Sequence, residues 1–169
     1  MNLLYPKIIK KKVFKDSRGF LQEIFKKKKF KINFKFSLLV NSKKNVFRGF
    51  HFQKRKQQHK ILIVAQGELN DYCLDLRRKS KSFQKIFKFN LKQNSILFIP
   101  KGFAHAYVSL KKNTQVIYFL SEYRFKKYEE TLSIYDKKLN LKIRKNYILS
   151  KKDKKGISID IFNKKIKSL

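Results

Sequence analysis

The segment Arg48–Gln53, RGFHFQ, places a histidine between two phenylalanines directly after an arginine and a glycine. If this segment is a strand, successive side chains point to opposite faces, so Phe50 and Phe52 face one way while His51 faces the other. Two hydrophobic anchors would hold the imidazole rigidly and leave it able to reach a ligand. Because histidine titrates nearest neutrality, a general base is one role for His51. A metal ligand and a polar core residue are the alternatives.

The chain contains two other histidines, His59 and His105. His105 lies in PKGFAHAY, residues 100–107, and the pattern Pro-x-Gly-x-x-His resembles an element of the cupins, which are double-sheet jelly rolls. A metal site needs three or four N or O ligands, yet no second histidine follows two residues after His51. We therefore expect acid–base chemistry without a metal. His59 is expected to be exposed and without a role.

Short apolar segments at close spacing predict many strands with few helices. Residues 13–25 predict a hairpin with its turn at 16–19, and apolar residues alternating over 32–40 predict a strand with one buried face. Further strands are expected over residues 60–66, 69–76, 83–90, 96–99, 105–110 and 114–121. Only residues 127–138 have a helical pattern.

This pattern predicts an all-β fold, either a sandwich or a barrel, with jelly rolls among the options. No repeat, long linker or domain boundary interrupts the chain. We therefore expect one domain over residues 1–169, a jelly roll of the cupin type (a double-stranded β-helix) with short peripheral helices.

The charge is strongly basic, with 44 Lys and Arg against 11 Asp and Glu, a formal net charge of +33. Such a field attracts polyanions, so nucleic acid and anionic membrane surfaces must be considered as partners. The excess is nearly all lysine, is spread over almost the whole chain and accompanies abundant Phe, Ile and Asn, as an AT-rich coding sequence would produce. We therefore expect solvated lysine-rich faces and no nucleic-acid partner.

The single cysteine, Cys73, excludes an intrachain disulfide and fits a reducing compartment, and its apolar neighbours indicate a small buried hydrophobe. No apolar stretch approaches the roughly 18 residues that a membrane span needs. The N-terminal MNLLYPKIIKKK carries its basic residues after a short apolar piece, unlike a secretion signal. We expect a cytoplasmic protein with no membrane span.

Five ordered blocks resemble the dTDP-4-dehydrorhamnose 3,5-epimerase family over most of the chain, from about Val13 to Asp153. The blocks are DSRGFLQEIF (16–25), NVFRGFHFQ (45–53), KILIVAQGEL with DLRRKSKSF (60–83), IPKGFAHAYVSL (99–110) and VIYF (116–119). The family removes a proton from carbons flanking a ketone on a nucleotide-linked hexose and returns it to the opposite face.

This resemblance implies an isomerase of nucleotide-diphosphate sugars that feeds deoxysugar or surface polysaccharide (lipopolysaccharide) biosynthesis. It also implies a homodimer. No metal or redox cofactor is expected, because the substrate ketone itself stabilises the carbanion.

The resemblance also implies four catalytic residues. His51 matches the family's base, Lys60 the lysine that stabilises the enolate oxygen, and Tyr118 the tyrosine that reprotonates the carbon. Asp153 matches the carboxylate that orients the base. The structural alternatives are a surface lysine, a core aromatic and a solvated counter-charge for Lys60, Tyr118 and Asp153, respectively.

Six further positions resemble the family's substrate-binding residues: Arg18, Phe20, Glu23, Arg48, His105 and Tyr123. Arg48 and Arg18 would contact the diphosphate, because a guanidinium fork suits phosphate oxygens, and Arg18 would reach a neighbouring subunit's ligand. Tyr123 falls where the family stacks an aromatic ring on its base. The alternatives are a structural ion pair for Arg48 and a turn cap for His105.

The chain departs from the family pattern at three places. Phe36 and Leu38 stand where the family carries a Gln and an Asn that help to recognise the nucleotide, and residues 142–145, KIRK, replace a Trp-Pro segment. The nucleotide base and the exact sugar therefore stay open. The alternative functions are a nucleotide-sugar 3,4-ketoisomerase on the same fold, a non-catalytic basic binding module, and a degenerate epimerase that binds without turnover.

Overall fold

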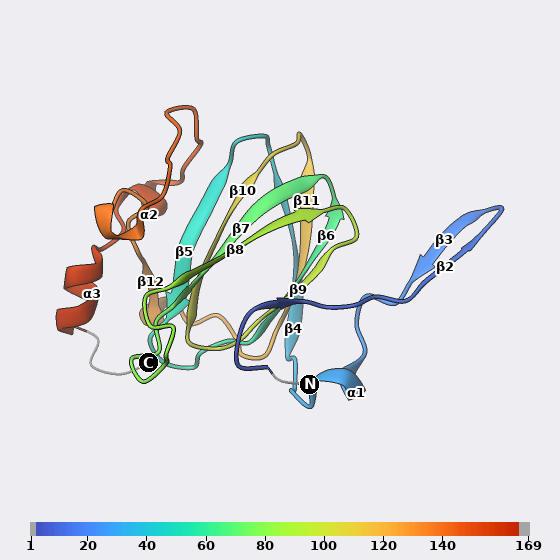
Figure 1. Cartoon of the computed structure of the whole chain (residues 1–169), viewed down its shortest axis with the longest axis horizontal. Helices are drawn as coiled ribbons and strands as arrows, with labels where there is room; N and C mark the ends of the chain where they lie inside the picture. Colours follow the sequence, from blue (N-terminus) through green and yellow to red (C-terminus); the bar gives the residue numbers. More distant parts are fainter. Residues whose placement is uncertain (1–2, 166–169) are drawn as a thin grey trace.

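Two five-stranded antiparallel sheets form the body of the protein in its computed structural model, which describes residues 3–165 (Figure 1). The first sheet has the order β1 (Lys7–Ile8), β9 (Ile96–Ile99), β6 (Lys60–Gln66), β11 (Thr114–Leu120) and β4 (Phe36–Ser42). The second has the order β12 (Glu129–Thr131), β5 (Phe47–Gln53), β10 (Phe103–Ser109), β7 (Glu68–Asp75) and β8 (Ile86–Lys92). The expected all-β jelly roll is confirmed. The expected domain range of 1–169 extends over residues 1–2 and 166–169, which lie outside the described residues.

The hairpin predicted within residues 13–25 is present as β2 (Val13–Asp16) and β3 (Gly19–Gln22). It projects away from both sheets (Figure 1). The strand expected over 32–40 begins only at Phe36, because Ile32 and Phe34 pack beneath the first sheet instead of pairing with it. The other predicted strands are present to within a few residues.

The prediction of a helix over residues 127–138 is wrong. Glu129–Thr131 pairs with β5 as β12, so tertiary strand pairing overrides the local helical pattern and leaves one 3₁₀ turn on either side. The helical elements are η1 (Lys126–Tyr128), η2 (Lys137–Leu139), α1 (Lys27–Phe30), α2 (Lys151–Lys154) and α3 (Ile159–Lys165). Among residues 3–165, no helix is long and apolar enough to cross a membrane.

One hydrophobic core fills part of the space between the sheets. Its members come from strands of both sheets: Leu62, Val64, Leu69, Cys73, Leu91, Leu97, Ile99, Phe103, Tyr107, Val116, Tyr118 and Leu120. Cys73 is fully buried in this core, which confirms it as a small buried hydrophobe.

The outer face of each sheet is covered by a terminal segment of the chain. Ile9 and Phe30 from the N-terminal side pack on the first sheet, while residues 132–162 pack on the second. A strand buried on both faces needs apolar side chains at successive positions, which explains the unbroken apolar runs at 61–64 and 96–99. The C-terminal segment is thereby held against β5.

His59 immediately precedes β6. It was expected to be exposed, but it is partly buried. Its ring stacks on Phe98 at 5.8 Å between centroids, and the backbone N–H of Lys101 donates to His59 Nδ1 at 3.3 Å. Burial, with the nearby charge of Lys101, lowers the pKa of His59 to about 4. These contacts fix the chain just before Lys60, the first residue of β6.

The neutral state of His59 predicts a loss of stability in acid. Between about pH 6.5 and 4 the unfolded chain binds a proton that the folded chain does not, so the free energy of unfolding falls as pH falls. The His59→Phe variant keeps an aromatic ring on Phe98 but has no group that titrates there. Its free energy of unfolding should therefore lack this part of the dependence on pH. Urea unfolding of the wild type and the variant between about pH 6.5 and 4 measures this difference. The same change in the free energy of unfolding with pH in both proteins would contradict the role of His59.

Candidate active site

A cavity of about 360 Å³ opens between the two sheets at one end of the core. Residues of both sheets and of the C-terminal segment line it. The lining includes these residues predicted from the sequence: Arg48, His51, Lys60, His105, Tyr118 and Asp153. Chain segments more than 100 residues apart thus meet in one site.

An irregularity in β5 sets the direction of the side chains from the second sheet. His51 lies opposite His105 of β10, whereas Arg48 lies opposite Tyr107, so β5 uses one residue more than its partner over this stretch. Phe50 and Phe52 face the outer core and His51 faces the cavity, as predicted. The extra residue brings Arg48 to the same face as His51, although simple alternation over three positions would separate them.

Gly49 makes this irregularity sterically feasible. It has φ +121°, and a Cβ at this position would lie 2.4 Å from the carbonyl oxygen of His105 and 2.6 Å from Ala106. No larger residue fits without moving β10. The Gly49 N–H also points towards Asp153 Oδ1, at 3.4 Å.

His51 and Asp153 form a hydrogen-bonded pair in the cavity. His51 Nε2–H donates to Asp153 Oδ1 at 2.5 Å, and the Ser150 hydroxyl donates to Asp153 Oδ2 at 2.6 Å. Burial alone would raise the pKa of Asp153, but these hydrogen bonds hold it below the ordinary value. Within the described part of the chain, no partner competes for His51 Nδ1, which is therefore the nitrogen able to accept a proton.

Lys60 and Tyr118 face this pair from the first sheet. Burial lowers the pKa of Lys60, and the nearby carboxylates of Asp71 and Glu129 offset part of the shift. Burial raises the pKa of Tyr118 well above its ordinary value, with Tyr107 adding to the effect, so the phenol stays protonated at neutral pH. An imidazole thus comes from one sheet, and an amine and a protonated phenol come from the other.

His105 lies on the floor of the cavity, where it is buried and paired with Asp71. His105 Nε2–H donates to Asp71 Oδ2 at 2.7 Å, and the Cys73 thiol donates to Asp71 Oδ1 at 3.3 Å. Burial lowers the pKa of His105, and the charge of Lys60 adds to this. His105 therefore belongs to the cavity floor instead of capping the turn that precedes β10.

Arg48 is oriented by two residues of β4 and one of β10. Arg48 Nε–H donates to the Ser42 hydroxyl at 3.1 Å, and its NH2 group donates to the Asn41 carbonyl at 3.3 Å. The Ser42 hydroxyl also shares a hydrogen bond of 2.9 Å with the buried Tyr107 hydroxyl. The guanidinium is held by neutral groups, so its charge remains available to an anion.

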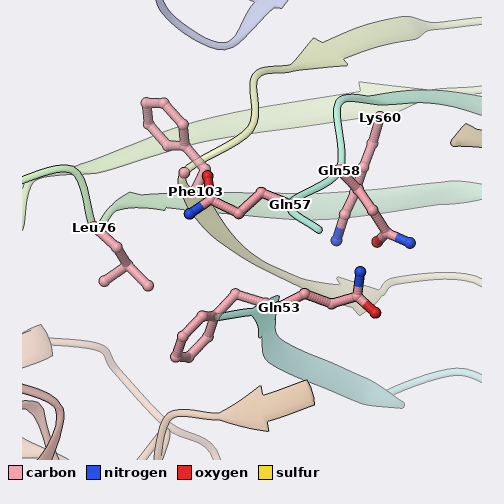
Figure 2. Close-up of a pocket in the computed structure, with 8 residues that line it drawn as sticks. Gln53, Gln57, Gln58, Lys60, Leu76 and Phe103 are labelled. Carbon is pink, nitrogen blue, oxygen red and sulfur yellow. The ribbon is translucent and has the colours of Figure 1, made fainter. Parts of the chain in front are cut away.

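The rim of the cavity is polar. Glu129 accepts from Arg124 and, at 2.8 Å, from Lys152, and side-chain hydrogen bonds with Arg124 lower its pKa to about 2. Figure 2 shows the polar ends of Gln53, Gln58 and Lys60 directed into the adjoining part of the same space. Both glutamines also donate to the carbonyl of Tyr123, which ties the 122–125 loop to this end of the sheets.

Four predicted binding residues do not line the cavity. Arg18, Phe20 and Glu23 lie on or just after the projecting hairpin, where Arg18 pairs with Asp16 at 2.6 Å. Tyr123 lies at the mouth, half exposed. In residues 3–165, no three His, Cys, Asp or Glu side chains converge in a way that could hold a metal ion.

Comparison with known proteins shows the family of the chain. The family model described as dTDP-4-dehydrorhamnose 3,5-epimerase matches residues 3–160. The chain belongs to this family. A family member from Shigella flexneri, named dTDP-4-dehydrorhamnose 3,5-epimerase, is 33% identical over 159 residues, 88% of each chain.

Two further relatives bear the family name or a closely similar one. An epimerase of the same name from Neisseria gonorrhoeae is 37% identical over 75% of this chain, which spans only 40% of that longer protein. The crystal structure of dTDP-6-deoxy-D-glucose-3,5-epimerase from Legionella pneumophila, in complex with dTDP-4-keto-L-rhamnose, has a TM-score of 0.90 at 27% identity. It covers 95% of this chain and 91% of the other.

The sequence analysis missed several residues that support the cavity, of which Asp71, the partner of His105, is the most informative. Leu69, Asp71 and Cys73 alternate along β7, so an acidic side chain occupies an inward position between two apolar ones. A carboxylate is buried at such a position only if it has hydrogen-bonding or charged partners. The alternation of residue types along this segment was therefore enough to predict that Asp71 is buried with a polar partner. Tyr107 and Ser42 gave no comparable signal.

The steric requirement at Gly49 can be tested against a glycine of similar φ. In Gly49→Ala the methyl group would collide with β10, so the free energy of unfolding should fall by about 2–4 kcal/mol. The control is Gly19→Ala, because Gly19 has φ +134° with no atom within 4 Å and should lose only about 1 kcal/mol. Urea unfolding of both variants measures this, and equal losses would contradict the steric account.

Proposed function

We propose that the protein epimerises a dTDP-linked 4-keto-6-deoxyhexose at the carbons flanking the ketone, with the ten predicted residues in the roles that the family resemblance implies. The arrangement of the cavity carries the proposal. His51 and Asp153 stand on the wall formed by the second sheet and α2, and Tyr118 stands on the wall formed by the first. A sugar bound between them meets a base on one face and an acid on the other.

Proton removal begins at His51. Nδ1 takes the proton from the carbon beside the ketone, the electrons of the C–H bond move into an enolate, and Asp153 stabilises the resulting imidazolium. Lys60 lies where an ammonium can stabilise the enolate oxygen in a partly buried site.

Inversion is completed from the opposite wall. Tyr118 donates its phenolic proton to the other face of the same carbon and regains one from solvent, while His51 releases its own, so the atoms balance. Because burial raises the pKa of Tyr118, the phenol is protonated when the substrate arrives, so its proton is in place to be donated to the enolate carbon.

The diphosphate is assigned to Arg48, whose fork is held by Ser42 and Asn41 and faces the cavity. His105 is assigned to the sugar at the cavity floor, and Tyr123 to a ring contact at the mouth. The dTDP-sugar in the Legionella pneumophila epimerase supports this class of substrate.

The projecting hairpin supports a homodimer as part of the proposal. Phe14, Phe20 and Leu21 are 61%, 54% and 65% exposed on an arm that packs on neither sheet (Figure 1). Such an apolar arm needs a covering surface. A partner subunit that provides it would also bring Arg18, Phe20 and Glu23 to the mouth of its own site. The protein is further proposed to work in the cytoplasm and to supply deoxysugar or surface polysaccharide synthesis.

Deuterium exchange separates the two proton-transfer steps. With a dTDP-4-keto-6-deoxyhexose in D₂O, the wild type should exchange ring protons beside the ketone and invert those carbons. His51→Asn should lower exchange by about 10³-fold, whereas Tyr118→Phe should still exchange but return the label to the original face. NMR measures both, and a shifted carbonyl would indicate a ketoisomerase. Absence of wild-type exchange would exclude the proposal.

Mixed dimers test whether Arg18 acts across subunits. Arg18→Ala and His51→Asn subunits carrying different tags can be co-expressed and purified as heterodimers. If Arg18 serves the partner's site, one site per dimer is intact and about half of the wild-type rate should return. The Arg18→Ala homodimer must itself lose most of the wild-type rate, because a residue outside any site would also leave half of the rate in the heterodimer. Heterodimers as inactive as the two parents would place Arg18 in its own subunit's site.

A further inference from the structure

The 122–125 loop forms part of the mouth of the cavity. It carries Tyr123, which the proposed function assigns to a ring contact with the ligand, and Arg124, which lines the cavity. None of the four residues of this loop belongs to a strand or a helix. The position of the loop therefore depends on its contacts with other elements.

Gln53, the last residue of β5, uses its side-chain amide to hold this loop. Its Nε2 group donates to the Lys56 carbonyl at 2.7 Å and to the Tyr123 carbonyl at 3.2 Å. Its Oε1 atom accepts from the Phe125 N–H at 2.6 Å. Only this orientation of the amide pairs each of its groups with a partner of the opposite kind. Although Gln53 lines the cavity, both of its amide hydrogens are used within the protein and neither is free for a ligand.

A second glutamine holds the neighbouring part of the loop. Gln58 Nε2 donates to the Glu122 carbonyl at 2.8 Å and lies 3.4 Å from the Tyr123 carbonyl oxygen, which also accepts from Gln53. Figure 2 shows the amide ends of Gln53 and Gln58 extended towards each other. Two side chains from the chain between β5 and Lys60 thus bind the backbone of the loop at successive residues.

The Tyr123 side chain is held separately, from β4. The Tyr123 ring stacks on Phe36 with 5.8 Å between centroids, and Lys35 forms an ion pair with Glu122 at 2.7 Å. The ring contact fixes the tyrosine only if the backbone beneath it stays in place. A loop that is ordered before the ligand arrives avoids the entropy cost of ordering on binding.

We propose that Gln53 is a positioning residue that, with Gln58, holds the 122–125 loop in the conformation that binds the nucleotide sugar. This rests on the proposed function, in which Tyr123 contacts the ligand. Apparent affinity falls in proportion to the fraction of molecules whose loop is in place. Loss of the Gln53 amide therefore weakens binding but leaves the proton transfers at His51 and Tyr118 intact.

Ligand binding and turnover test the proposal in Gln53→Leu. If the loop of this variant is in place about a tenth of the time, calorimetry should show about 10-fold weaker binding of dTDP. With a dTDP-4-keto-6-deoxyhexose, KM should rise by a similar factor while kcat stays within about 2-fold of the wild type. A fall in kcat with KM unchanged would overturn the proposal, because it would place Gln53 in the chemical step.

Amide hydrogen exchange measured by NMR follows the loop directly, since the Phe125 N–H donates to Gln53 Oε1. In Gln53→Leu this amide should exchange at least about 10-fold faster than in the wild type. Saturating dTDP should slow it again, because the coupling between loop order and ligand binding is reciprocal. Faster exchange that dTDP does not slow would show that the loop does not hold the ligand.

Two further variants complete the test. Gln57→Leu is the matched control, since Figure 2 shows the Gln57 amide directed away from those of Gln53 and Gln58, and it should keep wild-type affinity and exchange. Gln58→Leu should show both changes to a smaller degree, and it serves if Gln53→Leu does not fold. Wild-type dTDP affinity in the Gln53 and Gln58 variants would overturn the inference. If the wild type itself binds no dTDP, the proposed function fails and the inference fails with it.

Discussion

The site depends on one extra residue in β5, at the point where Gly49 passes β10. Two residues, Gly49 and Phe50, separate Arg48 from His51, whereas only Ala106 separates their partners on β10, so both side chains enter the cavity while Phe50 stays in the outer core. No atom larger than hydrogen fits on Gly49 beside the His105 carbonyl. A regular strand would turn either the guanidinium or the imidazole out of the site.

The C-terminal segment serves this irregular strand in two ways. Its apolar residues, Leu132, Ile159 and Phe162 among them, bury the outer face of the second sheet. The same packing brings α2 to β5, where Ser150 caps the helix and Asp153 accepts from His51. Stability and the orientation of the His51 ring are therefore coupled, since loosening this segment would release the carboxylate that accepts from His51 Nε2.

Much of the fold could be predicted from apolar periodicity, because strands buried on one or both faces leave a clear pattern. The ordered family blocks pointed to His51, Lys60, Tyr118 and Asp153, which the fold brings into one cavity. Long-range pairing could not be predicted locally: the 127–138 segment reads as helix, yet its middle is a strand added to β5. The sequence also could not show that Arg48 faces the cavity. One extra residue in β5 changes the face that the Arg48 side chain occupies, and the amino-acid composition carries no sign of it.

In the proposed reaction a sugar carbon lies between His51 and Tyr118, which reach it from opposite faces of the ring. A crystal structure with the non-reacting dTDP-6-deoxy-D-glucose tests this most directly. We expect His51 Nδ1 on one face of the pyranose and the Tyr118 hydroxyl on the other, each about 3–3.5 Å from a carbon adjacent to C4. A pyranose with both groups on the same face, or bound outside the cavity, would contradict it.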